Sequence, residues 1–226
     1  MAQASSSQRW CLPVPGRLAA HAPAQVRLAP AAAEALARLL PVLGCGEEAA
    51  ALAFDGLAHG LSDDPVAAER LHAIGEDELV HDALIRSLSA ALPVADVSDR
   101  LAVARRFHID LGAGDAVDHL ARIAALDSAV CGLLERLCRP GTPIAEDWPT
   151  ADLLRRIGRD EARHVRVSRA LASERRDAAR LTGVAGPVRE ALAGMLQCAG
   201  DDLEALGYDP AWLRTRVARL PDGLFA

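Results

Sequence analysis

The chain has 226 residues, of which 51% are hydrophobic and 25% are charged, and its formal net charge is -6. This length suffices for one domain with a sizeable core, and the balance of apolar and charged residues excludes an intrinsically disordered chain. The acidic charge argues against nucleic acid as the main partner, because phosphate binding requires a basic surface.

Helices are expected throughout, because Ala and Leu dominate, only 3% of the residues are aromatic, and no segment alternates with the period of a strand. Prolines concentrated near the start indicate an N-terminal arm, followed by a short helix over 31–40 that Pro41 interrupts. A longer helix is predicted over 44–61. Asp64 is predicted to cap the next helix, over 65–92, with a proline at its first position.

A long connection over 94–114 follows the second long helix. The remaining predicted helices cover 98–108 within the connection, 115–138, 150–181 with Thr150 as its cap, 188–205, and a short segment after Asp209-Pro210. One long connection among four long helices is the pattern of ferritin-like bundles. The sequence therefore predicts an all-α, ferritin-like four-helix bundle over 44–181, after an arm and short helix over 1–43 and before a packed helical extension over 182–226.

The chain lacks the features of an exported or membrane-bound protein. Its first residues are polar and contain no signal-peptide hydrophobic region. No apolar run approaches the ~18 residues that span a bilayer. Five cysteines without C-x-x-C spacing are expected to be reduced thiols. The sequence therefore predicts a cytoplasmic protein without a membrane partner.

An internal repeat carries the strongest functional signal. Residues 74–81 read Ile-Gly-Glu-Asp-Glu-Leu-Val-His, and residues 157–164 read Ile-Gly-Arg-Asp-Glu-Ala-Arg-His. Both copies follow the pattern I-G-x-D-E-x-x-H, on the second and fourth long helices. A single E-x-x-H often occurs by chance, whereas two copies with matched flanks favour a metal site over coincidence.

Helix geometry explains the spacing within each copy. At ~100° per residue, positions three apart lie on one face of a helix, so Glu78 with His81 can hold one ion, and Glu161 with His164 another. Apolar residues at helical spacing flank both pairs. This pattern predicts that the pairs point inward and are not surface contacts, and buried groups of this kind are costly unless paired or metal-bound.

A dinuclear site of this type needs one more carboxylate from each of the other two helices. On the first long helix, Glu47 shares its face with apolar residues. Glu48 shares its face with Asp55 and His59, which are expected to face solvent. Glu47 and Glu78 also lie at nearly equal distances from the turn that joins their helices. Glu47 is therefore the expected ligand, and Glu48 is the alternative.

On the third long helix the candidates are Asp127 and Glu135. Asp127 lies within an apolar face, at the same distance as Glu161 from the loop between their helices. Glu135 would lie roughly 12 Å off that level at the ~1.5 Å rise of a helix. Asp127 is therefore the expected ligand.

Asp77 and Asp160 immediately precede the glutamates of the two repeats. Metal-bound imidazoles usually donate their other N–H to a carboxylate, which fixes the orientation of the ring. We therefore expect Asp77 to contact His164 and Asp160 to contact His81, although two merely exposed acids are the alternative. Four further histidines fall off this face and are expected to be surface or structural residues: His59, His72, His108 and His119.

At these positions the chain resembles the ferritin-like superfamily of dinuclear carboxylate proteins, which includes bacterioferritin, rubrerythrin, the ribonucleotide reductase small subunit and the diiron oxygenases. The resemblance covers about 44–181 and rests on Glu47, Glu78, His81, Asp127, Glu161 and His164. It implies two iron ions, or iron with manganese, that bind and reduce dioxygen as a co-substrate.

Departures from individual members narrow this expectation. The paired cysteines of a rubredoxin tail are missing, and the one tyrosine, Tyr208, lies outside the predicted bundle, which argues against a radical-forming reductase subunit. The additional segments exceed those of a minimal storage ferritin and can wall a substrate pocket.

The resemblance therefore implies a diiron oxidase or oxygenase that oxidises a small organic substrate in biosynthetic metabolism. It would act as a monomer or homodimer with an external electron donor. The alternatives are a ferritin-like iron-handling, ferroxidase or storage protein, and an RNA-modifying hydroxylase, which the acidic charge disfavours.

Overall fold

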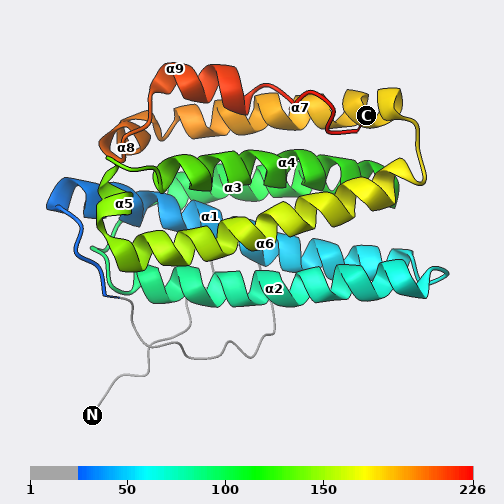
Figure 1. The fold of residues 1–226 in the computed structure, drawn as a ribbon, viewed down its shortest axis with the longest axis horizontal. Coiled ribbons are helices and arrows are strands. Elements are labelled where there is room, and N and C mark those ends of the chain that lie inside the picture. Colours follow the sequence, from blue (N-terminus) through cyan, green and yellow to red (C-terminus); the bar gives the residue numbers. More distant parts are fainter. Residues whose placement is uncertain (1–24, 226) are drawn as a thin grey trace, which may run out of the picture.

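The computed structural model describes residues 25–225, which are predominantly helical and contain no strand (Figure 1). The prediction of an all-α fold is confirmed. Of the arm predicted over 1–43, residues 1–24 lie outside the described part of the chain. None of the helices within 25–225 carries an apolar stretch long enough to cross a bilayer.

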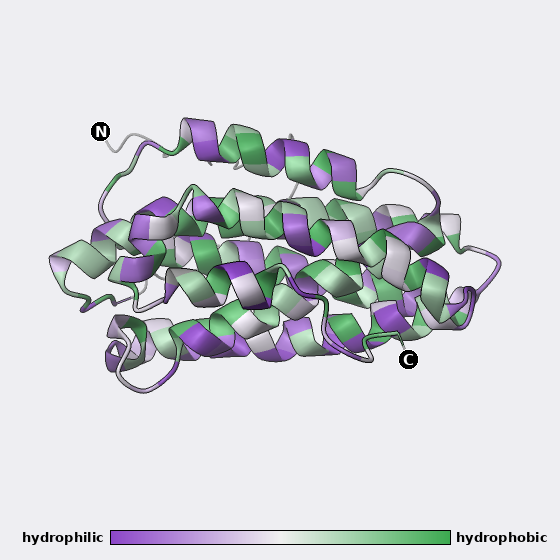
Figure 2. Cartoon of the chain, turned by 90° about the horizontal axis from the view of Figure 1, so that it is seen from above, coloured by the Kyte–Doolittle hydropathy of each residue, from purple (hydrophilic) through white to green (hydrophobic). Residues whose placement is uncertain are grey.

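Four long helices form the body of the molecule (Figure 1). They are α1 (Pro30–Gly60), α2 (Pro65–Ser89), α4 (Ala116–Leu137) and α6 (Trp148–Ser173). α1 packs along α2, α4 packs along α6, and α2 also contacts α6. In Figure 2 hydrophobic and hydrophilic residues are interspersed along each helix, as expected for helices that bury one face.

α1 is one continuous helix, whereas the sequence predicted an interruption at Pro41. A proline inside a helix removes one backbone hydrogen bond and usually bends or breaks the helix. Here the flanking side chains of Leu36, Leu40 and Cys45 are all buried. Core packing on both sides of Pro41 therefore outweighs the lost hydrogen bond.

The start of α2 confirms the predicted cap. Asp64 accepts a hydrogen bond from the backbone amide of Ala67 at 3.0 Å, and Pro65 is the first helical residue. The start of α6 differs, because the short helix α5 (Pro143–Glu146) precedes it and was not predicted. Thr150 lies in the first turn of α6 instead of capping it, and its hydroxyl donates to Asp147 at 2.8 Å.

The segment after α6 also departs from the prediction. α6 ends at Ser173, and α7 (Ala178–Gln197) begins after Asp177, which accepts a hydrogen bond from the amide of Arg180 at 2.9 Å. α7 continues through Pro187, where the sequence predicted a helix start. Both predicted domain boundaries, after residues 43 and 181, therefore fall inside helices.

The remaining helices cover α1 and α4. α3 (Ser98–Leu111) lies in the connection between α2 and α4, as predicted, and contacts α1 and α7. α7 packs on α4, on the side away from α2 (Figure 1). It is followed by α8 (Gly200–Ala205), α9 (Pro210–Trp212) and a π-helical turn, η1 (Leu213–Val217). The C-terminal extension thus packs on the long helices.

Cysteine pairing differs from the expectation at one position. Cys131, Cys138 and Cys198 are free thiols, as expected. Cys45 is buried in α1 and disulfide-bonded. The expectation of reduced thiols is therefore wrong for Cys45, because sequence spacing alone does not show which cysteines meet in the folded chain.

Candidate metal centre

A layer of acidic and imidazole side chains interrupts the apolar interior at mid-length of the four long helices. A hydrophobic cluster that includes Leu71 and Leu120 lies on one side, and a cluster that includes Leu36 and Leu154 lies on the other. The layer between them consists of Glu47 on α1, Glu78 and His81 on α2, Asp127 on α4, and Glu161 and His164 on α6. All six side chains are buried. Burial of so many ionisable groups is costly unless they are paired or bind a metal ion.

Three carboxylates converge on His81. Its Nδ1 lies 3.2 Å from Glu47 Oε2, 3.2 Å from Glu78 Oε2 and 3.4 Å from Glu161 Oε1. A ring nitrogen carries at most one hydrogen, so it cannot satisfy three acceptors at once. Donor atoms of these four residues all lie within 4.8 Å of one another, and the buried group could therefore hold a metal ion.

His164 faces two of the same carboxylates. Its Nδ1 lies 3.0 Å from Glu78 Oε1 and 3.9 Å from Glu161 Oε1. Despite this proximity, the nitrogen is aligned for a hydrogen bond with none of the described residues. The ring centroids of His164 and His81 are 5.8 Å apart. The Nδ1 atoms of both imidazoles thus face the carboxylates of the layer.

The far nitrogen of each imidazole faces an aspartate from the other repeat. His81 Nε2 lies 3.3 Å from Asp160 Oδ2, and His164 Nε2 lies 3.4 Å from Asp77 Oδ2. These contacts pair the residues in the crossed order expected from the repeat, while their influence on a bound metal stays a prediction. Asp77 also accepts a hydrogen bond from Arg163, a contact that the repeat does not reveal.

Asp127 is buried, and one of its carboxylate oxygens, Oδ2, has no hydrogen-bond partner among the described residues. Burial, together with repulsion from Glu161 and Glu78, raises the pKa of Asp127 well above its usual range. Buried carboxylate oxygens normally have a partner. Asp127 is not a member of the close four-residue group, so its role as a ligand stays a prediction.

The alternative carboxylates lie elsewhere. The sequence indicated that the face of Glu48 is exposed, but its side chain is buried. The hydrogen bond that it accepts from Arg86 offsets the cost of burying its carboxylate. Arg86 also donates to Asp82 at 2.8 Å. It is therefore Glu47, and not Glu48, that joins His81 in the close group. Glu135 is exposed on α4.

The charges of the layer influence one another. Burial and the neighbouring carboxylate of Glu78 raise the pKa values of both Glu47 and Glu161. Burial alone would lower the pKa of His81, but hydrogen bonds with Glu161 and Glu47 outweigh burial and raise it. Burial opposes ionisation of Glu78, yet its contacts with His164 and His81 outweigh burial and lower its pKa to about 2. The layer therefore contains more acidic groups than its two imidazoles can neutralise.

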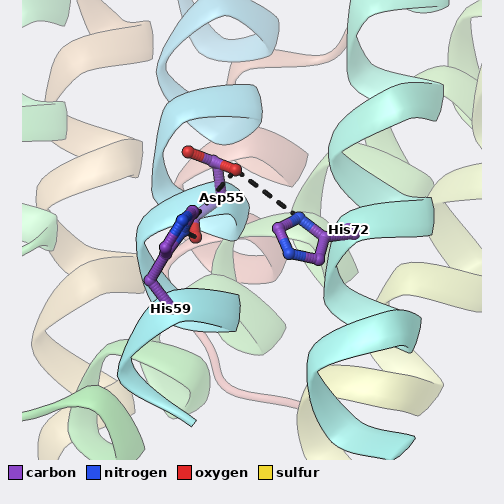
Figure 3. Close-up of side chains that lie close together, drawn as sticks. All are labelled: Asp55, His59 and His72. Atoms are coloured by element: carbon purple, nitrogen blue, oxygen red, sulfur yellow. Dashed lines mark hydrogen bonds and ion pairs between the residues drawn. The ribbon is translucent and has the colours of Figure 1, made fainter. Parts of the chain in front are cut away.

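A second group of possible ligands is exposed near the turn between α1 and α2 (Figure 3). Asp55 Oδ1 lies 3.5 Å from His72 Nδ1 and 3.7 Å from His59 Nδ1. Donor atoms of the three residues lie within 4.8 Å of one another. Because all three side chains are exposed, no cost of burial requires an ion there, and the expectation that His59 and His72 are surface residues is confirmed.

The donor set of the buried layer is rich in carboxylates and contains no thiolate, which argues against the soft metals that select sulfur. Its position at mid-length of four helices keeps it away from bulk water. Comparisons of the chain with known protein families, with curated proteins and with solved structures found no match. The functional interpretation therefore rests on the geometry of this layer.

Proposed function

We propose that the protein is a ferritin-like dinuclear metalloenzyme that uses dioxygen to oxidise a small organic substrate. The proposed ligands of two iron ions are Glu47, Glu78, His81, Asp127, Glu161 and His164. The observation that carries the proposal is the buried layer itself, in which two E-x-x-H pairs face each other from α2 and α6 and a carboxylate comes from each of α1 and α4. This is the arrangement of donors found in dinuclear carboxylate bundles.

The residues of the layer fit two divalent ions. The excess of buried acids would be neutralised by the charge of the ions. The unpartnered Oδ2 of Asp127 and the unaligned Nδ1 of His164 would each gain a partner. Metal ligation also accounts for the convergence of three carboxylates on His81, which hydrogen bonding to one ring nitrogen does not explain.

The chemistry follows from the donor set. When bound, two iron ions would supply the redox chemistry that activates dioxygen. In a hydroxylation, one oxygen atom of dioxygen enters a C–H bond of the substrate and the other leaves as water. The reaction consumes two electrons and two protons, which an external donor provides. Asp160 and Asp77 contribute by holding the rings of His81 and His164 in the orientation that directs Nδ1 inward.

An organic substrate is favoured over iron storage because a cavity of about 430 Å³ adjoins the layer, with Glu47 and Asp127 among its lining residues. Ligand-binding pockets typically have volumes of about 300–1,000 Å³. Storage of a mineral requires a large shell of subunits and no such apolar cavity.

The proposal is tested by anaerobic titration with ferrous iron, followed by exposure to dioxygen. We expect uptake to saturate near two ions per chain, and oxygen consumption to follow the amount of iron bound. Size-exclusion chromatography should give a monomer or dimer. Uptake of many ions per chain in a large assembly would instead establish a storage protein, and no uptake would contradict both functions.

A further inference from the structure

The cavity beside the candidate metal centre is long and narrow. Its lining residues span 36–53 on α1 and 119–137 on α4. At a rise of ~1.5 Å per residue, each stretch covers about 25 Å. A volume of about 430 Å³ spread over that length leaves a slender space. Glu47 and Asp127 lie near the middle of the two stretches, so the space passes the proposed metal ligands.

The wall of the cavity is mainly aliphatic. Its apolar side chains include Leu39, Leu43, Ile123, Leu126, Val130 and Leu133. Burial lowers the pKa values of His108 and His119, which also line it, to about 4, so both rings are neutral near pH 7. The hydroxyl of Tyr208 donates to the backbone carbonyl of Leu133 and is thereby occupied. Among the described residues, the charged lining groups are Arg105 and the carboxylates of the layer, so most of the wall that they form suits hydrocarbon.

The cavity reaches the surface between α1 and α3. Leu52 on α1 and Ile109 on α3 both line it, and they are 42% and 61% exposed. α3 buries only Ala104 and Leu111 among its own residues. A long apolar molecule can therefore enter at this edge while a polar group at its end stays in water.

We propose that the cavity binds an extended aliphatic chain, such as the acyl chain of a fatty acid, with its polar end at the mouth between α1 and α3. A methylene group of the chain would then lie beside Glu47 and Asp127. Oxidation of that chain rests on the proposed function, whereas binding of the chain does not require a metal ion. A compact aromatic molecule is the rival occupant, and it would leave much of the cavity length unfilled.

Calorimetric titration of the metal-free full-length protein with saturated, unbranched fatty acids, from octanoate to hexadecanoate, tests the proposal. Affinity should rise about fourfold for each methylene group that becomes buried, until the cavity is full. The heat-capacity change of binding should be negative. Naphthoate should bind more weakly than dodecanoate. Equal affinities along the series, or tighter binding of naphthoate, would overturn the proposal.

Matched variants locate the binding site. Ala50 lines the cavity one turn from Glu47, whereas Ala31 is exposed on the same helix. Ala50→Phe should weaken binding of dodecanoate by about tenfold or more because the space is already narrow, while Ala31→Phe should leave it unchanged. Equal binding in the two folded variants would contradict the assignment. If Ala50→Phe does not fold, as judged by circular dichroism, Leu39→Ala decides the question. This variant enlarges the cavity and should move the affinity plateau to longer chains, and an unmoved plateau would contradict the assignment.

The two proposals can fail separately. If fatty acids bind as expected but the protein takes up no iron, the aliphatic cavity stands and the diiron function is wrong. If iron binds and reacts with dioxygen while no fatty acid binds, the substrate class is wrong and the metal centre stands.

Discussion

The imidazole of His81 on α2 and the carboxylate of Asp160 on α6 lie 3.3 Å apart, between Nε2 and Oδ2. Because Asp160 occupies the far nitrogen, Nδ1 of the same ring faces the carboxylates of Glu47, Glu78 and Glu161. An aspartate in this position favours the tautomer whose Nδ1 lone pair is available to a metal ion. The contact links the two repeats, because each repeat supplies the aspartate that faces the other repeat's histidine.

We therefore predict that Asp160→Asn weakens iron binding without unfolding the protein. The substitution keeps the size of the side chain but removes the charge that orients the ring and raises its basicity. Loss of such an outer partner typically costs about 10–100-fold in affinity or activity. Anaerobic titration with ferrous iron measures the affinity, and stopped-flow mixing with dioxygen measures the reactivity. Wild-type values for both would show that Asp160 has no influence on the site.

Asp77→Asn should produce a similar but unequal loss. Asp77 contacts His164 and also accepts a hydrogen bond from Arg163. Arg163 lies 3.8 Å from Asp160, which is too far for a hydrogen bond, so its guanidinium is closer to Asp77 than to Asp160. Arg163→Ala is the matched control, because it removes the arginine and retains both aspartates. We expect Arg163→Ala to change the effect of Asp77→Asn more than that of Asp160→Asn in double-variant cycles.

Metal content gives a further prediction. After reconstitution with ferrous iron and removal of excess metal, elemental analysis should find close to two ions per chain. The exposed group Asp55, His59 and His72 could add loosely held metal (Figure 3). The variant His59→Ala/His72→Ala controls for this contribution and should retain both ions. If its metal content fell to zero, the exposed group would be the main site, and the buried layer would not be.

Paired substitutions distinguish the carboxylates that the sequence left open. Asp127→Ala should remove most of the metal from one of the two sites, whereas Glu135→Ala should leave the metal content unchanged because Glu135 is exposed. Equal metal contents would contradict the assignment of Asp127.

The same comparison on α1 should separate metal binding from stability. Glu47→Ala should lower metal content. Glu48→Ala should keep the metal but destabilise the fold by roughly 1–3 kcal/mol, because it removes one of the two carboxylates that accept hydrogen bonds from Arg86. Chemical denaturation of the metal-free proteins measures the second effect. A Glu48→Ala variant that loses iron at unchanged stability would reverse the assignment.

The proximity of the predicted residues follows from regularities that the sequence displays directly. Helix periodicity places Glu78 with His81 and Glu161 with His164 on single faces, and a short turn between antiparallel helices matches the levels of Glu47 and Glu78. The crossed contacts of Asp77 and Asp160 follow from the same periodicity once the two repeats face each other.

The features that sequence reasoning missed depend on partners distant in the chain. Pro41 does not end α1, because the core on both sides holds the helix together. Glu48 is buried through Arg86 on another helix, a pairing with no local signal. Asp177 caps α7, although the proline at position 187 indicated a later start. Helix boundaries and buried ion pairs of this kind are decided by tertiary packing, which overrides local propensity.

The last prediction concerns pH. Burial and mutual repulsion raise the pKa values of Glu47, Asp127 and Glu161, and the surrounding carboxylates raise that of His81. Groups with raised pKa values stabilise the metal-free protein while they are protonated, and this contribution is lost as the pH rises through the raised values. The contribution of Glu78 to stability has the opposite pH dependence, because its pKa is lowered. That pKa of about 2 places the loss of this contribution below the pH range of the measurement.

Metal binding has the reverse dependence, because ions must displace those protons. Apparent iron affinity should therefore rise with pH by about tenfold per pH unit for each proton displaced. The midpoint of thermal unfolding should fall for the metal-free protein between about pH 5 and about pH 8. Over the same range, the difference between the iron-loaded and metal-free midpoints should widen. Glu135→Ala should preserve both trends, whereas Glu161→Gln should flatten them, because one of the titrating carboxyls is gone. A metal-free protein that becomes more stable as the pH rises would show that the layer is ionised and compensated without metal, which contradicts the charge excess assigned to it.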